Sequence, residues 1–148
     1  MTLRLSKRTE YGLRAIIQLG RLWPTHYVQS RDLSKLEELP NKFLESILLA
    51  LRRGGFLESK VGSGGGYRLS RSPREIMVGE VIRRLEGRLS ARDESAPRDA
   101  SPGEHAVRIV NDRLTAATDD VLDNTTLEQL LEDVAKLGGG AQQEMYYI

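Results

Sequence analysis

A glycine-rich stretch, VGSGGG at residues 61–66, limits the folds open to this chain, because strand-like runs lie directly on both sides of it. FLESK precedes the stretch and YRLS follows it, and glycine permits the backbone conformations that a tight reversal requires. We therefore predict a two-stranded hairpin here. A nucleotide-phosphate loop is excluded, because no Lys-Ser/Thr follows the glycines and the next residues predict a strand rather than a helix.

Two helices are predicted ahead of a turn at Leu39-Pro40. Ser6 is a suitable N-cap for the first helix, in which apolar residues recur at helical spacing until Pro24. Ser30 is expected to cap the second helix, near residues 31–38. Its two inward-facing residues are expected to be Leu33 and Leu36.

A third helix is predicted after the turn, and Pro40 suits its first position. It should end at Gly54-Gly55, and its apolar stripe comprises Phe43, Leu44, Ile47, Leu48 and Leu51. Beyond the hairpin, Pro73 marks the exit and Gly87 ends a fourth amphipathic helix with Val78, Val81, Ile82 and Leu85. Residues 1–87 thus predict a mainly α domain, a winged helix-turn-helix with a two-stranded β wing.

The rest of the chain predicts a long C-terminal dimerisation helix. Residues 88–103 are polar and contain two prolines, as is typical of a linker or mobile loop. From Glu104 a helix is expected whose apolar residues alternate at spacings of three and four, the seam of a coiled coil: Val107, Val110, Leu114, Ala117 and Val121. Because such a seam requires a partner helix, we predict a homodimer.

A short last helix is expected to complete this arm at residues 104–137. Thr125-Thr126-Leu127-Glu128 indicates its capping box, and Gly138 closes it. Residues 138–148 are then a flexible tail. We find no internal repeat.

Charge is divided unevenly between the two parts. Residues 1–90 hold 17 Lys and Arg against 9 Asp and Glu, whereas residues 91–148 hold 5 against 12, and the charges of +8 and −7 give the net +1. A basic module joined to an acidic one indicates that the first part meets a polyanion, here double-stranded DNA.

The first turn of the third helix should face base edges in the major groove. Its polar residues suit base readout, because Asn pairs with adenine, Lys with guanine and Glu with cytosine: Asn41, Lys42, Glu45 and Ser46. Phe43 either touches a thymine methyl group or packs into the core. Backbone and wing contacts are expected from Lys7, Arg8, Arg14, Ser30, Arg31, Arg52, Arg53, Lys60, Ser63, Gly64, Gly65, Tyr67 and Arg68.

Cysteine is absent, which excludes disulfides, zinc-thiolate sites and cysteine-held iron–sulfur clusters. His26 and His105 are the two histidines of the chain, so a three-histidine metal site is excluded too. We expect no metal and no cofactor, and no nucleophile and base pair that would indicate an enzyme. No apolar run has the length of a membrane span or secretory signal, so we expect a cytoplasmic protein.

Three stretches resemble the Rrf family of bacterial regulators: RLSKRTEYGLRAI, the run from FLESILLALRRGG to VIRRLEG, and LDNTTLEQLL. The resemblance covers most of residues 3–87 and residues 122–131. It implies a dimer held by the long helix after the linker, with two winged domains presented to a palindromic operator.

Two departures from that family matter. Many members carry three cysteines in the segment that corresponds to residues 88–105, where they hold an iron–sulfur cluster, and this chain has none. His105 is therefore interpreted as an ordinary residue at the start of a helix. In the wing the family often has Arg before the glycines, whereas this chain has Val61 after Lys60, so Lys60 and Arg68 would substitute only in part.

The run Asp119-Asp120-x-x-Asp123 has the form of a magnesium-diphosphate motif, but it occurs once and on a predicted helix. We interpret it as a solvated acidic face that keeps the arm away from DNA.

Sequence thus favours a DNA-binding transcriptional regulator, a repressor, with a small-molecule or protein effector as a further expected partner. The alternative is a winged-helix module whose main partner is another protein.

Overall fold

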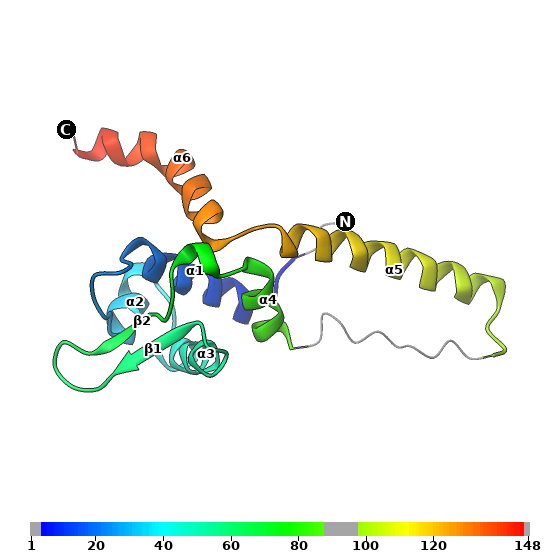
Figure 1. Ribbon diagram of the computed structural model, residues 1–148, viewed down its shortest axis with the longest axis horizontal. Helices are drawn as coiled ribbons and strands as arrows, with labels where there is room; N and C mark the ends of the chain where they lie inside the picture. Colours follow the sequence, from blue (N-terminus) through cyan, green and yellow to red (C-terminus); the bar gives the residue numbers. More distant parts are fainter. Residues whose placement is uncertain (1–3, 88–97, 147–148) are drawn as a thin grey trace.

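A computed structural model describes residues 4–87 and 98–146, with side chains as far as residue 138 (Figure 1). Three helices begin the chain, α1 (Lys7–Arg21), α2 (Ser30–Glu37) and α3 (Asn41–Arg53). The hairpin of β1 (Leu57–Lys60) and β2 (Gly66–Leu69), the short 3-10 helix η1 (Pro73–Glu75) and α4 (Val78–Glu86) complete a winged helix-turn-helix head. The predicted mainly α winged fold is thereby confirmed.

The head has a single core to which α3 contributes most. Leu44, Ile47, Leu48 and Leu51 of α3 are fully buried, and they meet Ile16 of α1 and Leu69 of β2 in one apolar cluster. Ser6 caps α1 as predicted, because its hydroxyl accepts a hydrogen bond from the backbone N–H of Thr9. Gly87 ends α4, also as predicted.

The start and the inner face of α2 differ from the prediction. Gln29, not Ser30, is the N-cap, and it makes no side-chain cap bond, so Ser30 is already the first helical residue. Leu33 is buried, but Leu36 is 60% exposed. Arg14 and Gln18 of α1 bond to Glu37 instead, so Leu33 and Glu37, one turn apart, form the inner edge of α2.

The turn between α2 and α3 is tight. Glu38 has a left-handed backbone with φ of 53°, and Leu39 behind it is buried. Pro40 lies one position earlier than predicted, because it is the N-cap of α3 rather than its first residue. Its extended backbone separates the two helices and fixes where α3 begins.

The wing is an antiparallel pair in which Leu57 faces Leu69 and Lys60 faces Gly66. Val28, between α1 and α2, adds a bridge to its outer edge through two hydrogen bonds of 2.8 Å with Tyr67. Gly66 permits this approach: its φ is +129°, and a Cβ there would lie 2.3 Å from the carbonyl oxygen of Val28.

Two helices form the arm, α5 (Pro102–Asp123) and α6 (Leu127–Tyr146). Ser101 and Glu104 make a capping box, so α5 starts two residues before the predicted Glu104. Most of the predicted linker, residues 88–97, lies outside the described residues.

The ends of α6 differ from the prediction. Its capping box joins Thr126 to Gln129, one residue later than predicted, through hydrogen bonds of 2.9 and 3.1 Å. The helix does not end at Gly138 but continues to Tyr146. A glycine inside a helix costs only about 1 kcal/mol, and Gly138 keeps a helical backbone.

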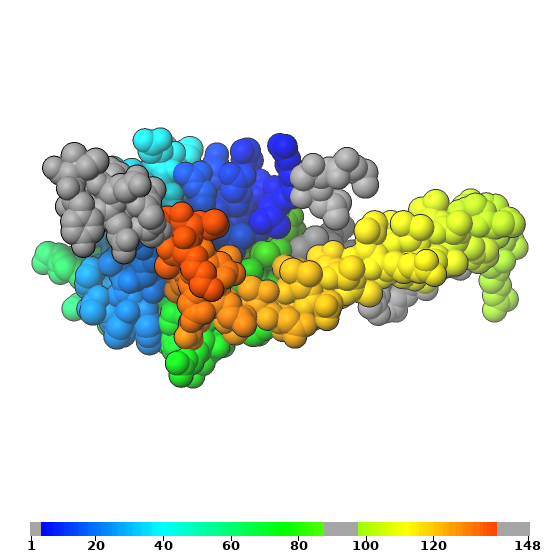
Figure 2. Space-filling model, turned by 90° about the horizontal axis from the view of Figure 1, so that it is seen from above, coloured from blue at the N-terminus to red at the C-terminus, as the bar shows by residue number. Residues whose placement is uncertain are grey.

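The arm is anchored to the head where α5 gives way to α6. Thr125 and Leu127 exchange backbone hydrogen bonds of 2.9 and 2.8 Å with Val78 and Ile76, and Leu127 is fully buried in the core of the head. From this anchor α5 projects well beyond the head, as Figures 1 and 2 show from two directions. None of the described helices carries an apolar stretch of membrane-spanning length.

Candidate nucleic-acid interface

The exposed face of α3 lies opposite its buried leucines. The predicted base-reading residues Asn41, Lys42, Glu45 and Ser46 are all exposed on it. Glu45 is held near the start of the helix, since the Asn41 amide and the Ser30 hydroxyl donate hydrogen bonds of 3.4 and 3.5 Å to its carboxylate. The structure therefore brings polar donors and acceptors together on one surface of α3.

The first helix borders this surface. The Arg8 guanidinium donates to the Ser46 hydroxyl at 3.4 Å, which places a predicted phosphate contact beside a predicted base contact. Phe43 is 37% exposed and meets the Tyr11 ring edge-on, with centroids 5.6 Å apart. Phe43 is thus half shielded by α1 and still reaches the surface.

The wing presents positive charge on both strands. Arg68 forms an ion pair with Glu58, which faces it across the hairpin, and its guanidinium carbon lies 4.4 Å from the ring centroid of Tyr27. The hydrogen bond with Glu58 raises the pKa of Arg68. Lys60 Nζ lies 5.9 Å from the same ring, so Tyr27 gathers both cations of the wing.

The tip of the wing is open. Val61 is 96% exposed, and Ser63 and Gly64 beside it are exposed too. Gly65 is buried, and it has no room for a side chain because a Cβ there would lie 2.2 Å from the carbonyl oxygen of Lys60. Tyr67 is half-buried in the bridge to Val28.

Four further predicted contacts are exposed and basic: Lys7, Arg31, Arg52 and Arg53. Lys7 also pairs with Glu10 at 3.5 Å, at the start of α1. Arg14 differs from them, because its guanidinium donates to the backbone carbonyl oxygen of Glu37 and also pairs with the side-chain carboxylate of Glu37 at 3.5 Å. Arg14 therefore stabilises the last turn of α2, and its contact with phosphate stays a prediction.

Sequence reasoning missed two residues of this surface. Leu49 lies two turns from Lys42 on the same side of α3, and it is only half-buried although it is apolar. Tyr27 lies between the two cations of the wing. Helical spacing would have indicated Leu49, whereas nothing in the sequence links Tyr27 to the wing.

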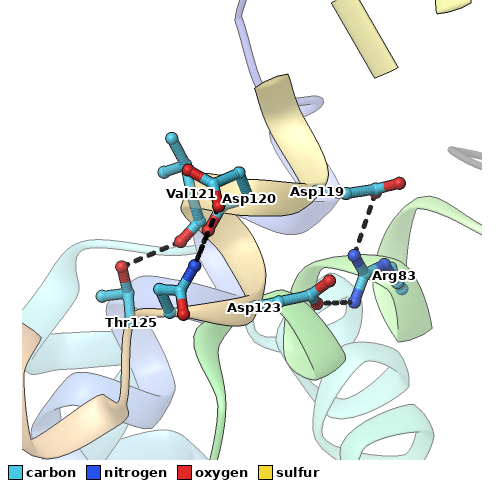
Figure 3. A network of polar contacts seen from close by, with 7 residues as sticks. Arg83, Asp119, Asp120, Val121, Asp123 and Thr125 are labelled. Atoms are coloured by element: carbon cyan, nitrogen blue, oxygen red, sulfur yellow. Dashed lines mark hydrogen bonds and ion pairs between the residues drawn. The ribbon is translucent and has the colours of Figure 1, made fainter. Parts of the chain in front are cut away.

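The sequence predicts that the acidic run of the arm is a solvated face, but in the structure two of its carboxylates bind the head. Asp119 and Asp123 bind the Arg83 guanidinium of the head, and Asp120 accepts hydrogen bonds from Asn124 (Figure 3). Within the described residues, no three His, Asp or Glu side chains come together in a way that could hold a metal ion.

An exposed polar α3, a basic two-stranded wing and a long arm define a DNA-binding protein of the winged helix-turn-helix class. Comparison with known proteins agrees. The chain is 31% identical over 147 residues to the HTH-type transcriptional regulator CymR of Bacillus subtilis, a match that covers 99% of this chain and 100% of that protein.

Solved structures give the same result. The structure of CymR (YrzC), the global cysteine regulator of B. subtilis, matches with a TM-score of 0.74 at 31% identity and covers 88% of this chain and 98% of that one. IscR of T. potens matches with a TM-score of 0.78, also at 31% identity, covering 93% and 92%. The Rrf2 family model, described as iron-dependent transcriptional regulator, matches residues 5–133. This chain belongs to the Rrf2 family, and it is a DNA-binding transcriptional regulator rather than an enzyme.

The iron in the family description does not fit the side chains of this protein. Protein-bound iron–sulfur clusters are held chiefly by cysteine thiolates, and the chain has no cysteine. His105, the histidine of the arm, is exposed in the first turn of α5. The donor set that a cysteine-held cluster needs is therefore missing.

Proposed function

We propose that this regulator is a repressor that binds a pseudo-palindromic operator as a homodimer. The contrast between the two faces of α3 carries the proposal. One face is fully buried in the head, and the other presents Lys42, Glu45 and Ser46 to solvent beside Arg8 of α1. A helix held so firmly from behind can enter a major groove without losing its own packing.

The exposed apolar seam of α5 supports the homodimer. No described residue of α5 is buried, and the exposed fractions of Val107, Val110, Leu114 and Val121 lie between 44% and 65%. Together with Ala117 they form a stripe along a helix of 22 residues, about 33 Å long. A second copy of the same helix would cover this stripe in a coiled-coil arrangement.

Each side chain of the reading face has a chemical partner in DNA. Lys42 suits guanine O6 and N7, Asn41 suits adenine, and Glu45 accepts from cytosine N4. Ser46 donates to either kind of base, and the exposed edge of Phe43 suits a thymine methyl group. We propose that these five residues read the half-site.

Phosphate contacts would come from α1, α2, the end of α3 and the wing. We propose for this role Lys7, Arg8, Ser30, Arg31, Arg52, Arg53, Lys60, Ser63, Gly64, Gly65, Tyr67 and Arg68. Arg68 keeps Glu58 as a neighbour, so its contribution to phosphate binding should be smaller than that of the exposed Arg53. With Val61 at the tip, the wing would follow the backbone without inserting an arginine into the minor groove.

Selection of bound fragments from the source genome by the purified protein tests the proposal and supplies the operator. Binding of the selected fragment should exceed that of a scrambled duplex, and the logarithm of the binding constant should fall linearly with the logarithm of salt concentration. Equal binding of both duplexes, or binding that high salt leaves unchanged, would contradict it.

Two substitutions separate the proposed roles. Lys42→Ala should relax the preference for the selected fragment, because a base contact is worth about 1–3 kcal/mol of discrimination. Arg53→Ala should weaken selected and scrambled duplexes equally and lower the salt slope by about one. Identical effects of the two substitutions, measured by fluorescence anisotropy, would refute this division.

We propose that the regulator works in the cytoplasm, where it meets chromosomal DNA. We also propose that it needs no metal or cofactor and that a small molecule or a partner protein supplies its signal. Isothermal titration of the metal-free protein with candidate effectors measures their binding. A change in operator affinity when an effector is bound then tests whether that effector supplies the signal.

A further inference from the structure

Arg83 of α4 connects the head to the arm through two carboxylates at once. Its guanidinium donates to Asp119 at 3.0 Å and to Asp123 at 2.6 Å, and these two residues lie one turn apart on α5 (Figure 3). About one third of the Arg83 side chain is exposed. A planar guanidinium that engages two fixed acceptors is held in one orientation, unlike a lysine or a single surface pair.

The main chains are also unusually close at this junction. A Cβ on Gly79 of α4 would lie 2.6 Å from the carbonyl oxygen of Leu122, so only glycine permits α4 and α5 to approach in this way. The backbone bridge at Thr125 and Leu127 fixes the end of α5 to the head. One point of attachment leaves the direction of α5 free, and the contacts at Gly79 and Arg83 supply further points along the helix.

The direction of α5 matters because the helix is long. Along about 33 Å, a tilt of roughly 10° displaces the far end by about 6 Å. That displacement exceeds the rise of about 3.4 Å between successive base pairs. If two copies join through α5, a small change of angle at each junction alters the separation of the two α3 helices by more than one base pair.

We propose that Arg83 is a positioning residue for operator recognition: clamped between Asp119 and Asp123, it fixes the angle between head and arm and so sets the half-site separation that the dimer accepts. This inference rests on the proposed homodimer with two half-sites. Arg83 itself needs no contact with DNA.

A second ion pair between the described residues of head and arm is more exposed. Arg74 pairs with Glu128 of α6 at 3.0 Å, but its side chain is 79% exposed and has one carboxylate partner. Its partner Glu128 directly follows the buried Leu127, where the backbone bridge already fixes the chain. Arg83 alone among these two cations acts on α5.

Two variants test the proposal from opposite sides of the junction, Arg83→Gln in the head and the double substitution Asp119→Asn with Asp123→Asn in the arm. Arg71→Gln is the control, because Arg71 pairs with Glu80 inside the head and its loss removes the same charge. Each protein is titrated with operators whose half-sites are moved by one or two base pairs in either direction.

Wild-type protein and the control should prefer one spacing by about tenfold, the scale of the energy needed to deform DNA to fit. Both junction variants should lose most of that preference, to within about threefold, while their salt slopes stay at the control value. The two variants change the net charge in opposite directions, so a shared loss of spacing preference cannot come from charge.

Retention of the wild-type spacing preference by either variant would overturn the proposal and leave the proposed function intact. The proposal would also be overturned if the head variant and the arm variant changed operator affinity in opposite directions by the same factor at every spacing. Such a result indicates a purely electrostatic effect. If the wild type itself binds without spacing preference or as a single copy, the proposed function and this inference both fail. Thermal melting of each variant shows that the head is folded, and the arm variant leaves every residue of the head unchanged.

Discussion

Glu86 joins the last turn of α4 to the first turn of α1. Its carboxylate accepts a hydrogen bond of 2.9 Å from the backbone N–H of Ser6, the residue that caps α1. Hydrogen bonds from the Thr9 and Ser6 side chains lower the pKa of Glu86 further below its usual value. Thr9 is fully buried, so this polar group is anchored inside the head. One carboxylate thus holds α1 where Arg8 borders the reading face.

The lowered pKa of Glu86 predicts a pH dependence of stability. Because the charged form is favoured in the folded state, its contribution is complete above the unfolded pKa of glutamate, about 4.3, and is lost as the pH falls from there through the lowered pKa. Glu86→Gln should lower the free energy of unfolding by about 1 kcal/mol at pH 7, and the difference should shrink below about pH 4.

Urea unfolding at a series of pH values measures this difference. The control Glu75→Gln removes an exposed carboxylate of the same head and should stay within about 0.5 kcal/mol of the wild type at pH 7. A difference between Glu86→Gln and wild type that is constant from pH 7 to pH 3 would refute the assignment.

At this scale, residue chemistry was predictable where it depends on local sequence. The Ser6 cap and the exposed polar turn of α3 follow from helical spacing alone. Partnerships across the fold were not, because they require the tertiary arrangement. Arg14 faces Glu37 from 23 residues away, and Arg83 meets Asp119 from 36 residues away. Its charge alone made Arg14 a candidate for phosphate, and the sequence indicated no partner for Arg83.

Among the elements, the wing requires a glycine at position 66 for two separate reasons. Gly66 combines a φ of +129° with an approach to Val28 that leaves no room for a side chain. Gly62 has a φ of +98° but open space around it. The two positions thus separate backbone strain from a steric clash.

Gly66→Ala should lower the free energy of unfolding by at least about 3 kcal/mol, because strain and displacement of Val28 add. Gly62→Ala is the matched control and should cost roughly 1–2 kcal/mol, since strain acts alone. Denaturant unfolding followed by circular dichroism measures both. Equal costs would show that the bridge to Val28 is not needed for the wing.

Element types were predictable from periodicity, whereas several element ends were not. Ser30 has the right chemistry for a cap, but Gln29 occupies the capping position because the chain enters α2 directly from the bridge at Val28. Gly138 has the residue type that commonly ends a helix, yet α6 continues through it. A cap or a stop residue is therefore a preference that the path of the neighbouring chain decides.

The whole molecule combines a buried junction with an exposed arm. Leu127, which sequence alone placed in a separate arm, is part of the core of the head, and partly buried Leu131 packs against that core. Periodicity could not reveal this, because Leu127 looks like any apolar residue of an amphipathic helix until its neighbours are known. The exposed seam of α5, in contrast, was visible in the sequence as a repeat of threes and fours.

The central claim is that two copies joined along α5 hold two α3 helices on one operator. Native mass spectrometry of the protein with a duplex that carries one selected operator tests it directly. We expect two chains per duplex, and we expect Leu114→Glu, which places a charge in the middle of the apolar seam, to abolish that complex. A single wild-type chain on the complete operator would contradict the account.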